Sequence, residues 1–360
     1  LAIVILNWNV RDLLRQCLRS LAAARQTTTA TIGVVVVDNA STDGSADMAQ
    51  AEFGWAHLIR APRNLGFTAG NNLALRALGV RPQGGEAPRT DEMGREIAAA
   101  RAAIAEAAPP PYVMLLNPDT EIVGDALAVM LDYMQRHPDV GLLGPRLRYA
   151  DGSIQPSRRR FPNRRTAFLE STLLQRWRRD DPALRRFYVA DRPDDVVQDV
   201  DWITGACMLA RGAALAEVGL LDEGFFMYSE EVDWGRRFKL AGWRVVYLPT
   251  AEVMHHEGRS SEQVVARRHI YFQTSKVRYY RKWDGQPMAE TLRLFLLATY
   301  AWQLAEESAK WLLGHKRALR RERAHRPGRE VRRGDPPARH RSDPALGVAA
   351  AGDPHPVVGP

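Results

Sequence analysis

The chain has 360 residues, of which 45% are hydrophobic and 26% charged, and its formal net charge is +8. This length holds one large domain or two modest ones, and the hydrophobic content is ordinary for a globular protein. Two cysteines, Cys17 and Cys207, lie in apolar patterns typical of buried side chains, so a disulfide framework is excluded. Nothing at the start of the given sequence resembles a signal peptide. Because Leu1 opens directly into a strand without a methionine, we expect the true beginning to be missing.

The first 80 residues alternate between strand and helix patterns. Short apolar runs predict strands at 2–6, 32–38 and 57–60. An apolar stripe at 13–21 predicts a helix after the first strand, a short helix follows the second, and a helix through Leu78 follows the third. This β-α-β-α order predicts an α/β fold with a doubly wound, mostly parallel sheet and helices on both faces.

Residues 80–111 interrupt this alternation. A Pro/Gly start, an Ala-rich middle and three closing prolines indicate a surface insertion with its own helix. The section 146–200 is less regular and rich in arginine. Around it the pattern continues with predicted strands at 112–116, 140–145, 206–210 and 243–249 and helices ending at Arg136 and Leu240.

An apolar, aromatic helix is predicted at Met288–Leu313. Only about 12 of its residues, 294–305, run without a charge, whereas a membrane span needs about 20. Two interpretations stay open: an amphipathic helix lying in a membrane interface, anchored by tryptophans and the arginines that follow, or a helix packed on its own domain.

The positive charge is concentrated near the C-terminus. Residues 314–341 contain 11 Lys and Arg against 3 Asp and Glu, a net charge of +8 that leaves the rest of the chain neutral. Such a segment indicates a partner with a negative surface, or it is a solvated disordered end. Because no aromatic residue interleaves the arginines after 315, we expect no nucleic acid and favour anionic lipid.

Polar side chains follow the first two predicted strands, where ligands bind in open α/β sheets. Asn7 and Asn9 come after the first strand, and Asp38 and Asn39 come after the second. A carboxylate at such a strand end suits a hydrogen bond to a base or ribose. An Asp-Asn pair also makes a good turn or helix N-cap, and both interpretations stay open.

A third group, Asn117-Pro118-Asp119, ends the buried strand 112–116. Proline fixes φ and ends the strand, which holds the two flanking side chains in a set geometry. Their oxygens can share Mg²⁺ or Mn²⁺ with a ligand's phosphates, or they form a plain turn that caps the next helix. His255 and His256, just past the last strand, add imidazoles that suit Mn²⁺.

A fourth group of acids begins the helix that ends near Gly242. Ser229 is the expected N-cap, and Glu230 and Glu231 complement the helix dipole, which is a purely structural role. Asp233 lies one turn from Glu230, where like charges repel and can raise a carboxyl pKa into the range of a general base.

The order and spacing of these motifs are similar to those of the inverting family 2 glycosyltransferases, and above all to their bacterial rhamnosyltransferase-like branch. The motifs are "NWN", "VVVVDNASTDGS", "NLGFTAGNN", "LLNPDTEI" and the run 204–256. The resemblance implies a Rossmann-like GT-A fold over residues 1–260, with a helical, possible membrane-binding region at 261–315 and a basic tail at 316–360. It also implies metal-assisted single displacement from a nucleotide-diphospho-sugar, with rhamnose as the sugar by analogy. The implied acceptor is a glycan or polyprenyl-diphosphate-linked glycan, handled in the cytoplasm at an anionic inner membrane surface.

The same resemblance implies roles for single residues. Asp119 and His255 would hold the divalent metal, in a motif that is usually Asp-x-Asp. Glu230-Glu231 falls on a Glu-Asp pair whose second member is the base, so Glu231 is one methylene longer than usual. Many members have an arginine where this chain has Gly70, and Arg63 is the expected substitute. The implied nucleotide-binding residues are Asn7, Asn9, Asp38, Arg63, Asn71 and Asn117, and the implied catalytic residues are Glu231, Glu230 and Asp233.

Two other functions fit parts of the sequence. A sugar nucleotidyltransferase would favour a Gly-rich phosphate loop with a lysine near the N-terminus, and "NWNVRDLLRQ" has neither. A non-catalytic module that binds glycan or nucleic acid would explain the basic tail, but every acidic site position is present.

Overall fold

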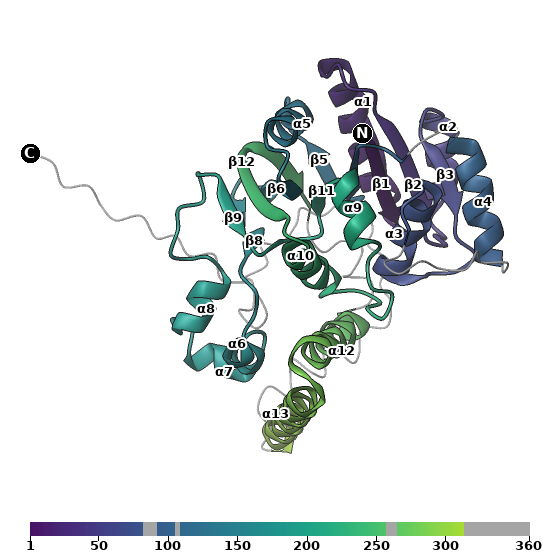
Figure 1. Ribbon diagram of the computed structural model, residues 1–360. Helices are drawn as coiled ribbons and strands as arrows, with labels where there is room; N and C mark the ends of the chain where they lie inside the picture. The colour runs from purple at the N-terminus through teal and green to yellow at the C-terminus, as the bar shows by residue number, and fades with distance from the viewer. Residues whose placement is uncertain (82–91, 105–108, 257–264, 313–360) are drawn as a thin grey trace, which may run out of the picture. The chain divides into compact units, whose positions relative to one another are not determined.

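The computed structural model describes residues 1–81, 92–104, 109–256 and 265–312. Its strands are β1 (Ala2–Asn7), β2 (Gly33–Asp38), β3 (His57–Arg60), β4 (Tyr112–Leu116), β5 (Thr120–Ile122), β6 (Val140–Arg148), β7 (Ile154–Gln155), β8 (Arg158–Arg159), β9 (Gln198–Val200), β10 (Trp202–Ile203), β11 (Cys207–Arg211) and β12 (Arg244–His255). Among these residues ten strands form one sheet in the order β3-β2-β1-β4-β11-β6-β12-β5, with β7 beside β6 and β9 beside β12 (Figure 1). β8 and β10 pair separately.

The helices between the strands are those that the apolar patterns predict, with short additions. They are α1 (Arg11–Thr27), α2 (Ser45–Glu52), α3 (Gly66–Ala77), α4 (Glu92–Ile104), α5 (Ala126–Arg136), α6 (Arg164–Leu169), α7 (Leu173–Trp177), α8 (Pro182–Phe187), α9 (Gly212–Val218), α10 (Glu230–Leu240), α12 (Val265–Asp284) and α13 (Gln286–Leu312). α4 lies in the expected insertion, whose other residues are described only in part. The predicted α/β fold class is confirmed.

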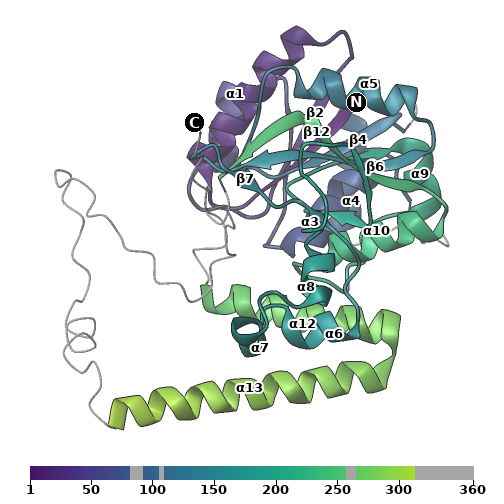
Figure 2. The same cartoon turned by 90° about the vertical axis from the view of Figure 1, so that its left-hand side faces the viewer.

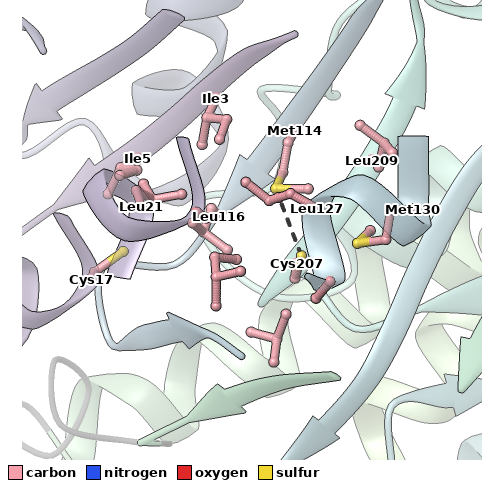
Figure 3. Close-up of a cluster of buried hydrophobic side chains, with 14 of the residues drawn as sticks. Ile3, Ile5, Cys17, Leu21, Met114, Leu116, Leu127, Met130, Cys207 and Leu209 are labelled. Carbon is pink, nitrogen blue, oxygen red and sulfur yellow. Dashed lines mark hydrogen bonds between the residues drawn. The ribbon is translucent and has the colours of Figure 1, made fainter. Parts of the chain in front are cut away.

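Strands β3, β2, β1 and β4 are parallel, as predicted for the first half of the chain. Ile3 and Ile5 point to one face, where α1 and α5 cover them, and Val4 points to the other, under α3 (Figure 3). Because both faces are buried, these strands are apolar at nearly every position rather than alternating. Cys17 and Cys207 are free and buried in the same core.

β11 enters the sheet between β4 and β6 and runs antiparallel to both. Its first residue, Cys207, therefore pairs with Leu116, the last residue of β4. The loop before β11 is thus brought to the tip of β4, where the Asn117 amide donates to the Ala206 carbonyl at 2.9 Å. The rest of the sheet mixes parallel and antiparallel pairs. The predicted parallel arrangement therefore holds throughout β3, β2, β1 and β4.

One short strand replaces the helix that was expected directly after Asn117-Pro118-Asp119. β5 follows at Thr120 and pairs antiparallel with the end of β12, with Thr120 opposite His255. The helix α5 begins only at Ala126. The interpretation of this motif as a plain helix cap is therefore wrong, because the motif turns the chain into a second strand.

A third apolar cluster joins α10 to the C-terminal helices. It contains Trp202, Val232, Tyr279, Leu292 and Leu296, so the first half of α13 packs against its own domain (Figure 2). Residues 1–301 form one compact unit, and a second unit begins at Trp302. The predicted boundary near residue 260 stays a prediction, and the basic tail lies outside the described residues.

The other side of α13 is apolar and exposed. Leu294 and Leu297 are 65% and 55% exposed, and in the last turns of the helix Trp302 and Leu304 are 65% and 70% exposed. The interpretation as a helix packed on its own domain holds for the first half of α13, and membrane binding by the exposed side stays a prediction. None of the helices in the described part of the chain is long and apolar enough to cross a membrane.

Candidate active site

The tips of β1 and β2 hold a hydrogen-bonded polar cluster. Asn7 and Asp38 are register partners, and the Asn7 amide donates to Asp38 Oδ1 and to Ser41 Oγ, both at 3.1 Å. Asp38 Oδ2 accepts the Ser41 amide at 3.0 Å, so this carboxylate also shapes the following turn. The two interpretations of Asp38, turn former and ligand contact, therefore involve the same side chain.

Asn9 extends this cluster along the turn. Its backbone has φ 52° and its amide donates to Ser41 Oγ at 3.0 Å, while its side-chain oxygen accepts the Thr42 amide at 2.7 Å. Ala40 has φ 61°. Two non-glycine residues in the left-handed region cost free energy and are typical of sites where backbone shape serves a ligand.

The loop before α3 is fixed against the loop before α10. Gly66 has φ +80°, and a Cβ there would lie 2.5 Å from the Phe226 carbonyl oxygen, which accepts the Phe67 amide at 2.8 Å. No other residue type fits, since both the dihedral and the close approach require glycine. The loop at Gly66 and the loop at Phe226, which are 160 positions apart in the sequence, are therefore in contact. They meet at the edge of the sheet where the strands end in polar residues.

The other expected nucleotide-binding residues lie around this loop. Asn71 is buried and donates to the Phe67 carbonyl at 2.9 Å. Arg63 is exposed, and within the described ranges it has no hydrogen bond or ion pair. Gly70 is buried against Leu6, whose side chain occupies the space that a Cβ would need, so an arginine cannot stand there without displacing Leu6.

A second polar cluster lies at the tip of β4, beside β1. His255 Nε2 is 3.3 Å from Asp119 Oδ1 and 3.5 Å from the Asn117 amide nitrogen. His255 Nδ1 is 2.9 Å from Gln155 Oε1, and the His256 backbone amide donates to the Asp119 carbonyl at 2.8 Å. The sequence-predicted metal residues are therefore in contact, although 136 positions separate them.

The donor set suits a divalent metal. Asp119 Oδ1 is buried and has no hydrogen-bond partner among the described residues. Since Gln155 Oε1 accepts from His255 Nδ1, the Nε2 lone pair is directed toward Asp119, which is the usual arrangement of a metal-binding imidazole. No group of three or more His, Cys, Asp or Glu side chains in the described ranges could hold a metal. Two protein ligands completed by substrate phosphates and water are nevertheless the pattern that Mg²⁺ commonly shows.

Glu230, which is buried, and Glu231, which is half-buried, form an acidic pair at the start of α10. The Oε2 atoms of both are buried and lack a hydrogen-bond partner within the part of the chain that is described. Burial raises the pKa of Glu231 to about 7, opposed by the nearby positive charge of Arg159. Burial and the charge of Glu231 raise the pKa of Glu230 well above its usual value. Both carboxyls therefore hold a proton more readily than exposed glutamates do.

Asp233 lies apart from this pair. It is fully buried, and its carboxylate accepts Arg237 Nε at 3.0 Å and Trp283 Nε1 at 2.9 Å and lies 2.7 Å from Lys282 Nζ. The repulsion expected between Asp233 and Glu230 is therefore not what raises the glutamate pKa values, since cations neutralise Asp233. The sequence pattern could not show this, because Lys282 and Trp283 come from α12.

The turn before α10 has a strained backbone, and contacts from α12 hold it in place. Tyr228 and Ser229 have φ 71° and 66°. Ser229 is the N-cap residue, as expected, but its side chain makes no capping hydrogen bond. Ser275 of α12 donates to the Met227 carbonyl at 2.7 Å, and Tyr271 stacks on Phe226 with ring centroids 4.6 Å apart. α12 therefore holds the backbone that presents Glu230 and Glu231.

Sequence reasoning missed two residues that the structure places beside the site. Gln155 orients His255, and Arg159 acts on Glu231 through its charge. Both lie in the irregular section 146–200, where neither helical nor strand periodicity marks a position. Their one signal was the arginine richness of that section, which is also typical of a solvated surface.

Comparisons with known proteins show the family of this chain. Residues 1–269 match the family described as glycosyltransferase like family 2. The chain is 32% identical over 243 residues to an N-acetylglucosaminyl-diphospho-decaprenol L-rhamnosyltransferase of Mycobacterium tuberculosis, covering 68% of this chain and 72% of the relative. It is 38% identical over 74 residues to rhamnosyltransferase WbbL of Escherichia coli, covering 20% and 28%.

A solved mannosyltransferase of Pyrobaculum calidifontis, in complex with GDP-Man and Mn²⁺, covers 90% of this chain and 82% of its own, with a TM-score of 0.47 and 13% identity. The family match spans most of the chain, and the mycobacterial relative is aligned over more than two thirds of it. The chain therefore belongs to glycosyltransferase family 2, as a rhamnosyltransferase-like member.

Proposed function

We propose that this glycosyltransferase moves rhamnose from deoxythymidine-diphospho-rhamnose to a hydroxyl of a polyprenyl-diphosphate-linked glycan, with inversion at the anomeric carbon. The observation that carries the proposal is a set of buried acceptor atoms without hydrogen-bond partners among the described residues: Asn7 Oδ1, Asp119 Oδ1, Glu230 Oε2 and Glu231 Oε2. Buried polar atoms are costly unless paired. A bound nucleotide sugar, its metal and an acceptor hydroxyl supply the missing partners.

The identity of sugar and acceptor rests on the mycobacterial relative. Its name states that it transfers L-rhamnose to N-acetylglucosaminyl-diphospho-decaprenol. At 32% identity over 243 residues, the same sugar and the same class of lipid-linked acceptor are the best-supported choice for this chain.

The nucleotide is proposed to lie along the tips of β2, β1 and β4. Asp38 and Asn7 contact the base, and Asn9 shapes the turn that borders it. Arg63, Asn71 and Asn117 complete the proposed set, with Arg63 as the exposed cation available to the diphosphate.

Asp119 and His255 are the proposed metal ligands. A bound Mn²⁺ or Mg²⁺ stabilises the negative charge that develops on a departing diphosphate. Gln155 favours the tautomer of the imidazole in which Nε2 is free. The hydrogen bond from the His256 backbone amide to the Asp119 carbonyl keeps the two ligands close together.

Glu231 is the proposed general base. It accepts the proton of the acceptor hydroxyl while that oxygen bonds to the anomeric carbon. The bond from this carbon to the diphosphate oxygen breaks, and its electron pair leaves with the nucleoside diphosphate. A base with a pKa of about 7 is matched to neutral pH. Glu230 lies beside it with its pKa raised by burial and by the charge of Glu231, and Asp233 positions α10.

Membrane association is proposed for the exposed side of α13. Leu294 and Leu297 are exposed on it, and basic residues follow in the sequence at 314–341. Apolar burial combined with attraction to anionic lipid is the usual basis of interfacial binding. We place the enzyme in the cytoplasm, at the inner face of the cell membrane, where a lipid-linked acceptor is available.

The proposal is tested with the full chain, deoxythymidine-diphospho-rhamnose and a short-chain N-acetylglucosaminyl diphospholipid, with and without Mn²⁺. We expect metal-dependent transfer that leaves the sugar in the inverted configuration, assigned by NMR of the product. Uridine- and guanosine-diphospho-sugars are the matched donors. Transfer with retention, or no transfer and no thermal stabilisation by any of the nucleotide sugars, would contradict the proposal.

A further inference from the structure

Arg159 is a buried cation in an aromatic cage. It is 8% exposed, and its guanidinium carbon lies 4.9 Å from the Tyr188 ring centroid and 6.0 Å from those of Phe187 and Trp202. Burial lowers the pKa of this guanidinium. Stacking on aromatic rings stabilises a cation only modestly, so a charge buried in this way is costly without an anion.

Within the described ranges Arg159 has no ion pair with a carboxylate, and its one hydrogen bond goes from Nη1 to the Arg158 carbonyl at 2.9 Å. The acidic neighbour Glu170 is occupied, because its Oε2 lies 3.1 Å from the buried Lys276 Nζ. Glu231 senses the positive charge of Arg159 but lies beyond ion-pair distance. Among the described residues, Glu170 therefore pairs with Lys276, and Arg159 has no carboxylate within ion-pair distance.

The position of Arg159 relates it to the reaction. The segment 155–159 begins at Gln155, which holds the metal ligand His255, and ends at Arg159, whose charge reaches the base Glu231. Arg159 thus lies on the base side of the segment, away from the end where the donor diphosphate is proposed to bind. Its packing partners are Phe187 of α8, Tyr188 directly after that helix, and Trp202 of β10. They lie beside the cluster that also contains residues of α12 and α13.

We propose that Arg159 binds a phosphate of the acceptor's lipid-linked diphosphate and so positions the acceptor sugar beside Glu231. This rests on the proposed function, because it assumes an acceptor that carries a diphosphate. A planar guanidinium suits this role, since it can give two parallel hydrogen bonds to one phosphate. The aromatic rings that hold Arg159 would keep this fork in one orientation.

Arg158 offers a matched control. Successive strand residues point to opposite faces, and Arg158 accordingly lies over Tyr247, 5.2 Å from the ring centroid, and donates to the Arg192 carbonyl at 2.8 Å. It is as buried as Arg159, but its charge is not among those that shift the pKa of Glu231. The same substitution at the two positions therefore separates loss of a buried arginine from loss of the proposed site.

The experiment compares two acceptors with the full chain: farnesyl-diphospho-N-acetylglucosamine and octyl N-acetylglucosaminide, which lacks the diphosphate. We expect Arg159→Gln to lower kcat/KM for the diphosphate acceptor about 10- to 100-fold, the scale of hydrogen bonds to a charged group. Both values are compared at a pH on the upper plateau of the pH profile, where losing the Arg159 charge no longer changes the protonation of Glu231. There we expect the octyl glycoside to lose far less than the diphosphate acceptor, and Arg158→Gln to affect both acceptors alike. If Arg159→Gln does not fold, Arg159→Lys keeps the charge and loses the fork, and it should show a smaller loss of the same selectivity.

Three results overturn the proposal. An equal loss for both acceptors makes Arg159 a structural residue or one that only tunes Glu231. A parallel loss of affinity for deoxythymidine diphosphate with Mn²⁺, measured by calorimetry, places Arg159 at the leaving group instead. The third test uses inorganic pyrophosphate in EDTA, which should stabilise the wild type against heat but not Arg159→Gln. Equal stabilisation contradicts the phosphate site, whereas a wild type that uses neither acceptor contradicts the proposed function alone.

Discussion

Gln155 Oε1 lies 2.9 Å from His255 Nδ1, and this contact joins two residues that are 100 positions apart. Because an amide oxygen only accepts hydrogen bonds, this contact favours a proton on Nδ1, which leaves Nε2 as the nitrogen that can bind a metal. Asp119 Oδ1 and the Asn117 amide nitrogen lie 3.3 and 3.5 Å from that Nε2. The tautomer of His255 is therefore set by Gln155, a residue that is not itself a proposed ligand.

Replacing Gln155 should weaken metal binding without touching a ligand. We expect Gln155→Leu to reduce the Mn²⁺ affinity about 10- to 100-fold, the usual effect of losing such a supporting hydrogen bond. Gln155→Glu keeps an acceptor and should retain binding. Calorimetry of Mn²⁺-dependent nucleoside diphosphate binding measures the effect, and Asp119→Ala should abolish that dependence. Undiminished metal-dependent binding in Asp119→Ala would refute the assignment of this ligand.

Replacing Glu231 should remove the base and leave donor binding intact. Glu231→Gln keeps the shape of the side chain and should lower kcat by about 10²-fold or more, the scale of general-base catalysis. The affinity for deoxythymidine diphosphate serves as the control. If Asp233→Asn is inactive while Glu231→Gln remains active, the base is misassigned.

The pKa shifts predict opposite pH trends for activity and stability. Since burial raises the pKa of Glu231 to about 7, kcat/KM should rise with pH through that value, and this step should persist in Glu230→Gln. A carboxyl group whose pKa is raised by folding lowers the free energy of unfolding as pH rises. The loss begins at the pKa in the unfolded chain, about 4.3, and is complete above the pKa in the folded protein. The thermal unfolding temperature of Glu230→Gln should therefore be higher than that of the wild type, by a difference that grows above about pH 4.3. A margin that does not depend on pH would contradict the raised pKa of Glu230.

Asp233 is predicted to matter for the attachment of α10 to α12. Asp233→Asn keeps the shape but removes the charge that Arg237 and Lys282 neutralise, which should lower stability by about 2 kcal/mol. Lys282 is partly exposed and can turn to solvent, which limits the loss. Urea unfolding measures it, with kcat expected to fall less than in Glu231→Gln. Wild-type stability in the variant would show that the buried contacts contribute nothing net.

The exposed side of α13 is testable with point variants rather than truncation, because Leu292 and Leu296 belong to the core. The double variant Leu294→Glu/Leu297→Glu should reduce co-sedimentation with anionic vesicles roughly tenfold or more, given the apolar area of two leucines. Leu240→Glu, at an equally exposed leucine on α10, is the matched control. Equal co-sedimentation of the control and the double variant would leave the leucines without a membrane role.

The sequence predicted the strand tips well because each combines a buried apolar run with an abrupt polar end. That pattern located Asn7, Asp38 and Asn117, and the structure brings them to neighbouring strands. It missed β5, because Thr-Glu-Ile is too short to show alternation. It misjudged the surroundings of Asp233, because helical spacing reports neighbours on the same helix and not cations from another one. The sequence pattern could not identify Arg159 and Gln155, because their roles depend on contacts with residues far away in the sequence.

The late position of β11 in the chain has a consequence for folding. The strands β1, β2, β3 and β4 are contributed by residues 2–116, whereas the strand that joins them to β6 comes only at 207–211. Pairings between such distant segments form slowly, because a long loop must close before the contacts are gained. We expect the four strands β1 to β4 to assemble first during synthesis. The Asn117 amide then lacks its hydrogen bond to the Ala206 carbonyl until β11 docks.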